Sequence, residues 1–486
     1  MKLVGWVLFF LFTFCGYSFS FDYYIVTDAG QFKARIEQSY PNHMGTYTDV
    51  YGATIRRMTN ESANVYPNYT ARTSTIENSD GTMFAVNSLA RAGSSWEIFT
   101  TADGIYRGTL KSFVGGTDSA YDHFVWSNDT PNMGYLFAKS KSPYDTYPGK
   151  LWKITINTKT WQASGEVLYT YLPEHLPSCP EGTSLGGVTN HDEGPTSWDG
   201  RYWATRMTCS DCTSENHTSV ALLVDRDMYG FEKPGIKGYV RIGDRVAYCL
   251  GISPGGNYLF WRATGMKVKA ISTATMIGEI AEESAKIINL SGLQAHFSLG
   301  YDDLGNEVYI APRQAGSGYD GHNSYAYWRF NQPSTGVTFL PWWMWRPTQY
   351  GGAFGAVHSV PAGINPGPRN WVAILPTGSA TDYPECGNEY RGTSTITYAH
   401  LSATNKKAFR VAHARNEGIG YVGELKAGAS RDGTKMYFQS DWCNTQTIQL
   451  FHAELPAKWW TEVIDYVPPL KDSAPPSPPK GVKVIK

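Results

Sequence analysis

The chain of 486 residues lacks an excess of charge of either sign. It holds 42 Lys and Arg against 43 Asp and Glu, which gives a formal net charge of −1. A nearly neutral chain creates no strong field that would attract nucleic acid or an anionic membrane surface. We therefore expect no nucleic-acid partner. The sequence also contains no phosphate loop and no H-E-x-x-H motif, which argues against a P-loop kinase and a zincin protease.

Long apolar runs are missing, apart from one near the start. Residues 3–14 are predominantly apolar, with Lys2 before them and the small residues Ser18 and Ser20 after them. Roughly a dozen residues are too few for a membrane span, but this pattern is typical of a secretory signal peptide. We predict a signal peptide at residues 1–20, no membrane span, and a secreted monomer that is extracellular or periplasmic.

Cysteine is scarce, with seven in all and six after residue 20. An even number in an exported chain favours disulfides, although the spacing leaves their connectivity open. We predict a disulfide between Cys386 and Cys443. The alternative for the remaining cysteines is a zinc site, whose four thiolates would be those of Cys179, Cys209, Cys212 and Cys249.

Aromatic residues and glycine are abundant, at 14% of the chain and 49 residues respectively, and this composition favours strands and tight turns. A turn rich in Asp, Asn or Gly followed by a short apolar-aromatic strand recurs seven times, as in "TSWDGRYWAT" from Thr196. Successive turns lie 49 to 66 residues apart, enough for four short strands each. The glycines that mark the seven units are Gly81, Gly134, Gly200, Gly256, Gly305, Gly367 and Gly433.

This repeat predicts an all-β fold, a β-propeller of seven four-stranded blades over residues 21–466, because stacked blades cover one another's faces. The alternative is an array of β-sandwiches or a large irregular β domain. Further strands are expected at 151–161, 219–227 and 394–411, and a single inserted helix at 277–288. The proline-rich residues 467–486 are expected to form an extended tail or linker.

Three of the units carry a resemblance to a known family. "SPGGNYLFW" from Ser253, "SRDGTKMYFQSDW" from Ser430 and "YDDLGNEVYIA" from Tyr301 resemble the repeats of TolB-like propellers. They are similar in particular to secreted propellers related to oligogalacturonate lyase and other propeller-type polysaccharide lyases. The resemblance implies an acidic-polysaccharide substrate and a site that uses His, Arg, Tyr and sometimes a metal.

Histidines and arginines recur at one place in the repeat. Nine to eleven residues before each marker glycine, where the chain enters the innermost strand, lie His123, His191, His296, His358, Arg72, Arg245 and Glu424. Equivalent positions in successive blades are related by rotation about the axis, so we expect these side chains to face one mouth of the central channel. Each of these histidines could instead brace a neighbouring blade.

These residue types suit cleavage of a uronic-acid polysaccharide by β-elimination. Neutral imidazoles bind divalent metals, so His123, His191, His296 and His358 are the candidate ligands of a divalent metal ion. His191 or His296 is the candidate base, and Arg72 or Arg245 the candidate partner of the substrate carboxylate.

A tryptophan-rich stretch offers a further substrate contact. Exposed tryptophans stack on sugar rings and arginine binds carboxylates, whereas the same residues when buried would be packing between blades. The candidate substrate-binding residues are Trp342, Trp343, Trp345 and Arg346.

Two functional hypotheses follow. The first is a secreted propeller that binds an acidic polysaccharide and cleaves it as a lyase. The second is a non-catalytic propeller for adhesion, whose partner is a surface protein or an extracellular polysaccharide.

Overall fold

The structure is a computed structural model that describes the placement of part of the chain. The described residues are 40–49, 53–67, 75–88, 95–110, 123–139, 148–179, 181–190, 196–210, 217–228, 236–242, 250–262, 266–271, 278–280, 285–288, 297–313, 324–332, 338–339, 357–359, 370–374, 395–404, 408–414, 427–442, 447–456 and 459. The predicted signal peptide and the predicted tail lie outside them and stay predictions.

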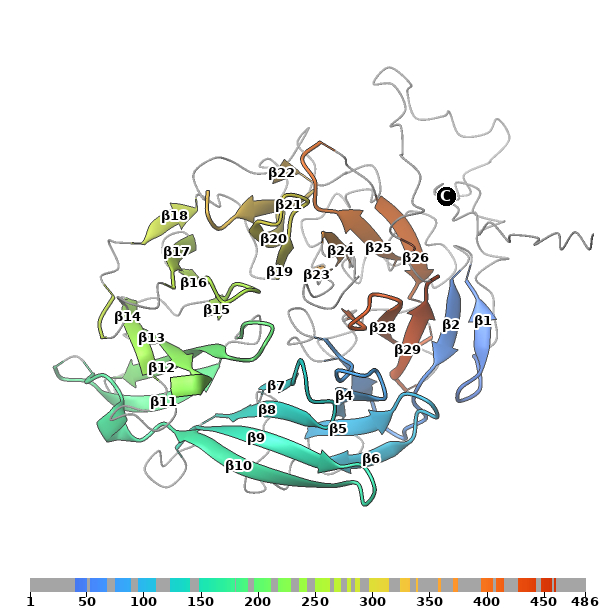
Figure 1. Cartoon of the computed structure of the whole chain (residues 1–486), viewed down its shortest axis with the longest axis horizontal. Coiled ribbons are helices and arrows are strands. Elements are labelled where there is room, and N and C mark those ends of the chain that lie inside the picture. Colours follow the sequence, from blue (N-terminus) through green and yellow to red (C-terminus); the bar gives the residue numbers. More distant parts are fainter. Residues whose placement is uncertain are drawn as a thin grey trace, which may run out of the picture.

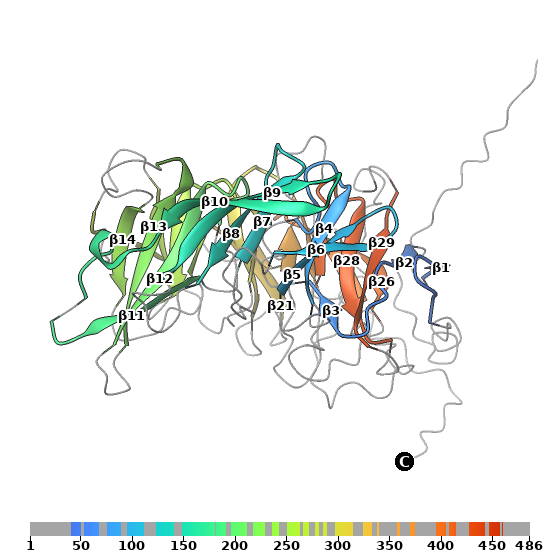
Figure 2. The same cartoon turned by 90° about the horizontal axis from the view of Figure 1, so that it is seen from below.

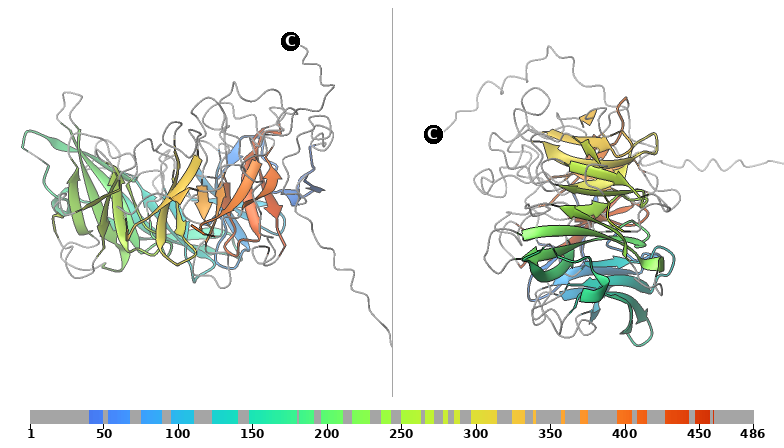
Figure 3. Two further views of the ribbon diagram at one scale, coloured as in Figure 1. Left: turned by 90° about the horizontal axis from the view of Figure 1, so that it is seen from above. Right: turned by 90° about the vertical axis from the view of Figure 1, so that its left-hand side faces the viewer.

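The strands form seven antiparallel sheets that stand around one central axis, which is a seven-bladed β-propeller (Figure 1). Seen edge on, the blades stand side by side in a single ring-shaped layer (Figures 2 and 3). The predicted fold class and blade number are thereby confirmed. Within a blade the strands follow chain order from the axis outward, as β7 to β10 show.

The blades are numbered here in chain order. Blade 1 contains β3 (Val65–Tyr66), β4 (Met83–Ser88), β5 (Ser95–Thr100) and β6 (Tyr106–Thr109). Blade 2 contains β7 (His123–Trp126), β8 (Met133–Ala138), β9 (Lys150–Asn157) and β10 (Gln162–Thr170). Blade 3 contains β11 (Ser184–Asn190), β12 (Tyr202–Ser210), β13 (His217–Asp225) and β14 (Ile236–Ile242). Blade 4 contains β15 (Leu250–Ile252), β16 (Tyr258–Arg262), β17 (Met266–Ala270) and β18 (Lys286–Ile288).

Blades 5 to 7 complete the ring. Blade 5 contains β19 (Ser298–Tyr301), β20 (Glu307–Arg313), β21 (Ser324–Arg329) and β22 (Thr338–Phe339). Blade 6 contains β23 (Val357–Ser359), β24 (Trp371–Ile374), β25 (Thr395–His400) and β26 (Ala408–His413). Blade 7 contains β27 (Ala427–Ala429), β28 (Lys435–Ser440), β29 (Gln449–Glu454) and β2 (Thr54–Arg57), with β1 (Thr46–Thr48) at its outer edge. Two short 3-10 turns, η3 (Pro173–His175) and η4 (Arg226–Met228), are the helical elements with described bounds.

The hydrophobic core lies between the blades. Seven clusters of buried apolar residues are present, one at each of the seven interfaces between neighbouring blades. Between blades 1 and 2, for example, the ring of Phe124 lies 5.8 Å from that of Trp96 and 5.0 Å from that of Trp126. Wide aromatic side chains fill the wedge between two twisted sheets, which explains the aromatic-rich composition.

The predicted turn joins the two inner strands of a blade in the structure. Its glycine has a φ between 63° and 80°, and the glycine N–H donates to the carbonyl three residues earlier at 2.9–3.1 Å. Ser253, the first residue of the blade 4 turn, accepts a hydrogen bond on Oγ from the N–H of Tyr258 at 2.9 Å. The turn therefore caps the strand that follows it. The glycines with this conformation are Gly81, Gly200, Gly256, Gly305 and Gly433.

The marker chosen for blade 2 was wrong. Gly134 lies inside β8, and the turn comes earlier, at Ser127–Asn132. A Cβ on Gly134 would lie 2.3 Å from the ring of Phe124, so this glycine is needed for close packing. Gly367, the marker chosen for blade 6, lies outside the described residues.

The ring is closed by strands from opposite ends of the chain. β2 pairs with β29 in antiparallel register, with Arg56 opposite His452. The Nε of Arg56 donates to the carboxylate of Glu454 at 3.0 Å across this junction. Blade 7 is thus assembled from three C-terminal strands and one N-terminal strand, with β1 as an additional edge strand.

The strand predictions were confirmed and the helix prediction was wrong. The expected strands at 151–161, 219–227 and 394–411 correspond to β9, β13 and the pair β25 and β26. Within the expected helix 277–288, however, Glu279 forms a parallel bridge with Tyr239 of β14, and β18 pairs with β17. Pairing with exposed strand edges overrides the local helical pattern there. In the part of the chain that the structure describes, no helix is long and apolar enough to cross a membrane.

Candidate functional site

Two of the four predicted metal ligands lie on strands that line the channel. His123 is the first residue of β7, and His358 is the middle residue of β23. The ring of His123 is buried, with 1% of the residue exposed. For His358 the structure describes the backbone alone.

The corrected turn changes the position of His123 within the repeat. His123 lies four residues before the first turn residue of its blade, Ser127. The residues six positions before their turns are Arg72, His191, His296 and Glu424.

The remaining predicted site residues lie outside the described residues, and the structure does not place them. They are the ring members Arg72, His191, Arg245, His296 and Glu424, and the substrate-binding candidates Trp342, Trp343, Trp345 and Arg346.

One end of the channel is crossed by contacts between blades that are not neighbours. Arg431, in the turn of blade 7, donates from Nη1 to the carbonyl of Ser127 in blade 2 at 3.2 Å and from Nη2 to Asn128. Blade 1 lies between these two blades, so the guanidinium reaches past the blade 1 turn near the axis. Burial lowers the pKa of Arg431 to about 10, and nearby Asp129 opposes this shift.

A second contact of the same kind lies at the turns of blades 3 to 5. The indole of Trp198 in blade 3 packs edge-on against Tyr301 in blade 5, with ring centroids 5.2 Å apart. Beneath them Glu307 accepts a hydrogen bond from the N–H of Gly255 in blade 4. Burial raises the pKa of Glu307, and its hydrogen bonds with Asn257, Gly255 and Ser253 oppose this.

These contacts link blades that are not neighbours at the turn end of the channel. The sequence predicted the His and Arg ring at the opposite end, where the chain enters each innermost strand. In blades 1 and 3, however, Arg72 and His191 follow β3 and β11 in the chain. Sequence reasoning missed the turn-end residues. The available signal was the second position of each turn, where Asn128, Trp198 and Arg431 follow the serine that begins the turn.

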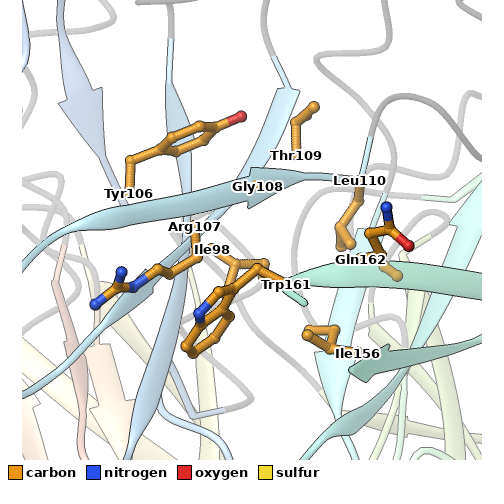
Figure 4. Close-up of a pocket in the computed structure, with 10 residues that line it drawn as sticks. Ile98, Tyr106, Arg107, Gly108, Thr109, Leu110, Ile156, Trp161 and Gln162 are labelled. Atoms are coloured by element: carbon orange, nitrogen blue, oxygen red, sulfur yellow. The ribbon is translucent and has the colours of Figure 1, made fainter. Parts of the chain in front are cut away.

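A groove at the outer rim of the ring is the second candidate site (Figure 4). It lies between the outermost strands of blades 1 and 2 and has a volume of about 410 Å³, within the range of small-ligand sites. Its lining, called the rim groove below, comprises Ile98, Tyr106, Arg107, Gly108, Thr109, Leu110, Ile156, Trp161, Gln162 and Ala163. The guanidinium of Arg107 lies 4.9 Å from the centroid of the Trp161 ring. Sequence reasoning missed this groove as well, because β6 and the β9–β10 hairpin belong to different units of the repeat.

The zinc site that was the alternative prediction for Cys179, Cys209, Cys212 and Cys249 is wrong. Cys179 and Cys209 form a disulfide, which leaves no thiolate on either. Cys386 and Cys443, the predicted disulfide partners, lie outside the described residues. Among the described residues no group of three or more His, Cys, Asp or Glu side chains could hold a metal ion. The disulfide is compatible with the predicted extracellular location.

The arrangement defines the protein as a seven-bladed β-propeller. Its fold is similar to that of an oligogalacturonate lyase solved in complex with manganese, with a TM-score of 0.53, 12% sequence identity, and coverage of 87% of this chain and 98% of that one. It is also similar to an oligogalacturonate lyase from Vibrio parahaemolyticus, with a TM-score of 0.53, 10% identity and coverage of 85% and 96%. Identities this low show a shared fold alone. The sequence matches no protein-family model and no curated protein.

Proposed function

We propose that this propeller binds an acidic polysaccharide at the mouth of its channel and cleaves it by β-elimination. The observation that carries the proposal is the asymmetry of the channel. Contacts of Arg431 and Trp198 link blades that are not neighbours at the turn end, and the sequence predicts the His and Arg ring at the other end. The fold shared with oligogalacturonate lyases supports the same reading.

Each step of the β-elimination is assigned to residues of the ring. A base, His191 or His296, removes the proton from C5 of the uronate, the C4–O bond breaks, and a C4=C5 double bond forms. The leaving oxygen takes up a proton. Arg72 or Arg245 holds the carboxylate, whose charge grows as C5 loses its proton.

A divalent metal ion is part of this proposal, with His123, His191, His296 and His358 as its ligands. When bound, such an ion neutralises the negative charge of the substrate carboxylate. The described residues neither assemble nor exclude the ligand set, because the side chains of His191, His296 and His358 lie outside them.

A non-catalytic binding protein is the second candidate function. The observation that favours it is the rim groove, which lies at the outer rim between the outermost strands of blades 1 and 2. A protein that only binds a glycan or a surface protein needs no channel chemistry.

The test is an assay for unsaturated uronate products. Purified protein is incubated with polygalacturonate, alginate and glucuronan, with manganese or with a chelator, and ultraviolet absorbance of the C4=C5 product is followed. We expect product from at least one substrate. His191→Ala and His296→Ala should abolish turnover while changing the free energy of unfolding by no more than about 1–2 kcal/mol.

His175→Ala is the matched control, because His175 lies on η3 after the outermost strand of blade 2 and should leave turnover unchanged. If no substrate gives unsaturated product under either condition, the lyase function is rejected and the binding function is retained. Full turnover in both channel variants would remove the two histidines from the mechanism.

A further inference from the structure

We infer that the rim groove is a carbohydrate-binding site for an uncharged sugar ring, separate from the channel. The inference does not depend on lyase activity, because the groove lies between β6 and the β9–β10 hairpin, the outermost parts of blades 1 and 2 (Figure 4).

The groove combines an apolar floor with an aromatic wall. Ile98, Leu110 and Ile156 are each no more than 3% exposed and form the buried part of the lining. Trp161 is half-buried beside them and packs against the same hydrophobic cluster. A sugar ring presents C–H groups on its faces, and an indole beside an apolar floor is suited to cover them.

The backbone at Trp161 is strained. Trp161 has a φ of 58°, at the last position of the hairpin loop between β9 and β10, and its N–H donates to the carbonyl of Asn157 at 2.7 Å. The left-handed conformation costs a bulky residue roughly 1–2 kcal/mol, and glycine adopts it freely. Residues with a strained backbone cluster at ligand-binding and active sites, where contacts of the side chain compensate for the strain energy.

The polar groups of the groove are held in place. Nε of Arg107 donates to Oγ1 of Thr100 at 3.0 Å, and Nη2 donates to the Asp103 carboxylate at 2.7 Å. Among the described residues no acceptor bonds to Nη1 of this guanidinium, which leaves it available to a ligand. The exposed amide of Gln162 adds both a donor and an acceptor beside it.

The charge of the groove selects an uncharged ligand. Arg107 is the one charged residue of its lining, and Asp103 compensates that charge. A compensated pair offers fixed hydrogen-bond directions without net attraction for a carboxylate. Vicinal hydroxyl groups, which both donate and accept, match Nη1 of Arg107 and the Gln162 amide.

The experiment is calorimetric titration of the full chain with cellotetraose, xylotetraose and mannotetraose, and with tetragalacturonate as the acidic arm. We expect at least one neutral tetrasaccharide to bind, with an affinity that changes less than about twofold between about 50 and 500 mM NaCl. Trp161→Gly should weaken this binding by about tenfold or more. The glycine suits the backbone at position 161, so the variant tests the side chain and keeps the hairpin. Gln162→Ala, at an exposed position, is a second variant that leaves the fold untouched, and it should weaken binding severalfold.

Trp152→Ala on β9 is the matched tryptophan control, because Trp152 is not part of the groove lining, and it should bind like the parent chain. The inference is overturned if no neutral tetrasaccharide binds, or if Trp161→Gly and Gln162→Ala both bind as tightly as the parent chain. Binding confined to tetragalacturonate, with affinity that falls steeply with salt, would also overturn it.

Cleavage of uronates measured on the same variants separates the rim groove from the channel site. Lost groove binding with unchanged cleavage is expected, and groove binding without any cleavage would remove only the lyase proposal.

Discussion

At the scale of single residues, each position of the recurring turn has its own physical task. The first residue, such as Ser253, caps the next strand through its side-chain oxygen. The second, such as Arg431 or Trp198, reaches across the end of the channel. The fourth is a glycine because the chain there needs a positive φ. One four-residue pattern therefore builds the blade and links blades that are not neighbours.

The fourth position allows a matched pair of substitutions. A Cβ at Gly256 would lie 2.7 Å from Cδ2 of Tyr202, whereas a Cβ at Gly305 would meet nothing within 4 Å. Both glycines have a positive φ, 73° and 80°. Gly305→Ala should therefore cost only the backbone strain, roughly 1–2 kcal/mol of unfolding free energy. Gly256→Ala should cost about 1–3 kcal/mol more, because Tyr202 must move. Urea denaturation of both variants measures the difference, and equal losses would show that Tyr202 gives way freely.

At the scale of elements, the inner strands are buried on both faces because each blade is covered by two neighbours. In β24, whose sequence is Trp-Val-Ala-Ile, all four residues are buried. Such strands need no polar face, which is why their sequences are nearly continuous in apolar and aromatic residues. The edge strands behave differently: β14 gains a bridge from Glu279, a residue of the connection within blade 4. That bridge joins two blades at their outer edge.

The disulfide is a second link at the scale of elements. It ties Cys179, in the segment before β11, to Cys209 of β12 across a sequence separation of 30 residues. Digestion of the unreduced protein should release one cross-linked peptide pair that contains both cysteines, detected by mass spectrometry. Replacing both with serine should lower the free energy of unfolding by about 2–4 kcal/mol, the usual effect for a loop of this length. Free alkylation of both thiols in denatured, unreduced protein would contradict this pairing.

At the scale of the whole molecule, the stability of the ring depends on how its two ends are joined. Glu454 of β29 accepts hydrogen bonds from Arg56 of β2 at 3.0 Å and from His452 at 2.9 Å. A ring that opens at this junction exposes the clusters on both sides of blade 7. The pairing of β2 with β29 is therefore the step that makes seven sheets into one closed structure.

The closure predicts a loss of stability in acid. The hydrogen bond from His452, followed by that from Arg56, lowers the pKa of Glu454 to about 2 from the ordinary value of 4.5. The ionised carboxylate thus stabilises the folded state above pH 4.5, and this contribution is lost as the pH falls towards 2. Burial lowers the pKa of His452 below 6.5, so protonation of its unfolded form weakens the fold further below that pH.

We expect the free energy of unfolding to fall between pH 6.5 and 2, and Glu454→Gln to remove part of the decline below pH 4.5. The effect should be no more than about 1 kcal/mol, because the Glu454 side chain is 37% exposed and solvent screens the pair. Denaturant titrations at several pH values measure it. Glu166→Gln, which removes an exposed ion pair with Lys153 on blade 2, is the control. Identical pH profiles for Glu454→Gln and the parent chain would show that this carboxylate does not act in the closure.

The amino-acid sequence by itself determined the blade repeat, because turn chemistry is local. An Asp-Gly or Gly-Gly pair with a serine before it adopts the same turn wherever it occurs, and the aromatic strand after it must be buried. Four of the seven units contain such a pair, and the recurrence of a turn followed by an aromatic strand in all seven specifies a propeller. The resemblance to lyase propellers agrees with the fold comparison. The same local reasoning was wrong where the turn has no glycine, at Ser127–Asn132, and where a helical pattern met an open strand edge, at Glu279.

Only the tertiary structure decided which distant residues meet. Arg431 donates a hydrogen bond to Ser127, Trp198 packs against Tyr301, and Arg107 lies over the ring of Trp161. These residues meet because the blades are arranged by rotation about one axis. No spacing in the sequence encodes these pairs, since each depends on the angle between blades. The partner of Cys179 was settled in the same way, by the register of β11 on β12. Local chemistry therefore defines the blade, and the geometry of the ring determines where ligands can reach it.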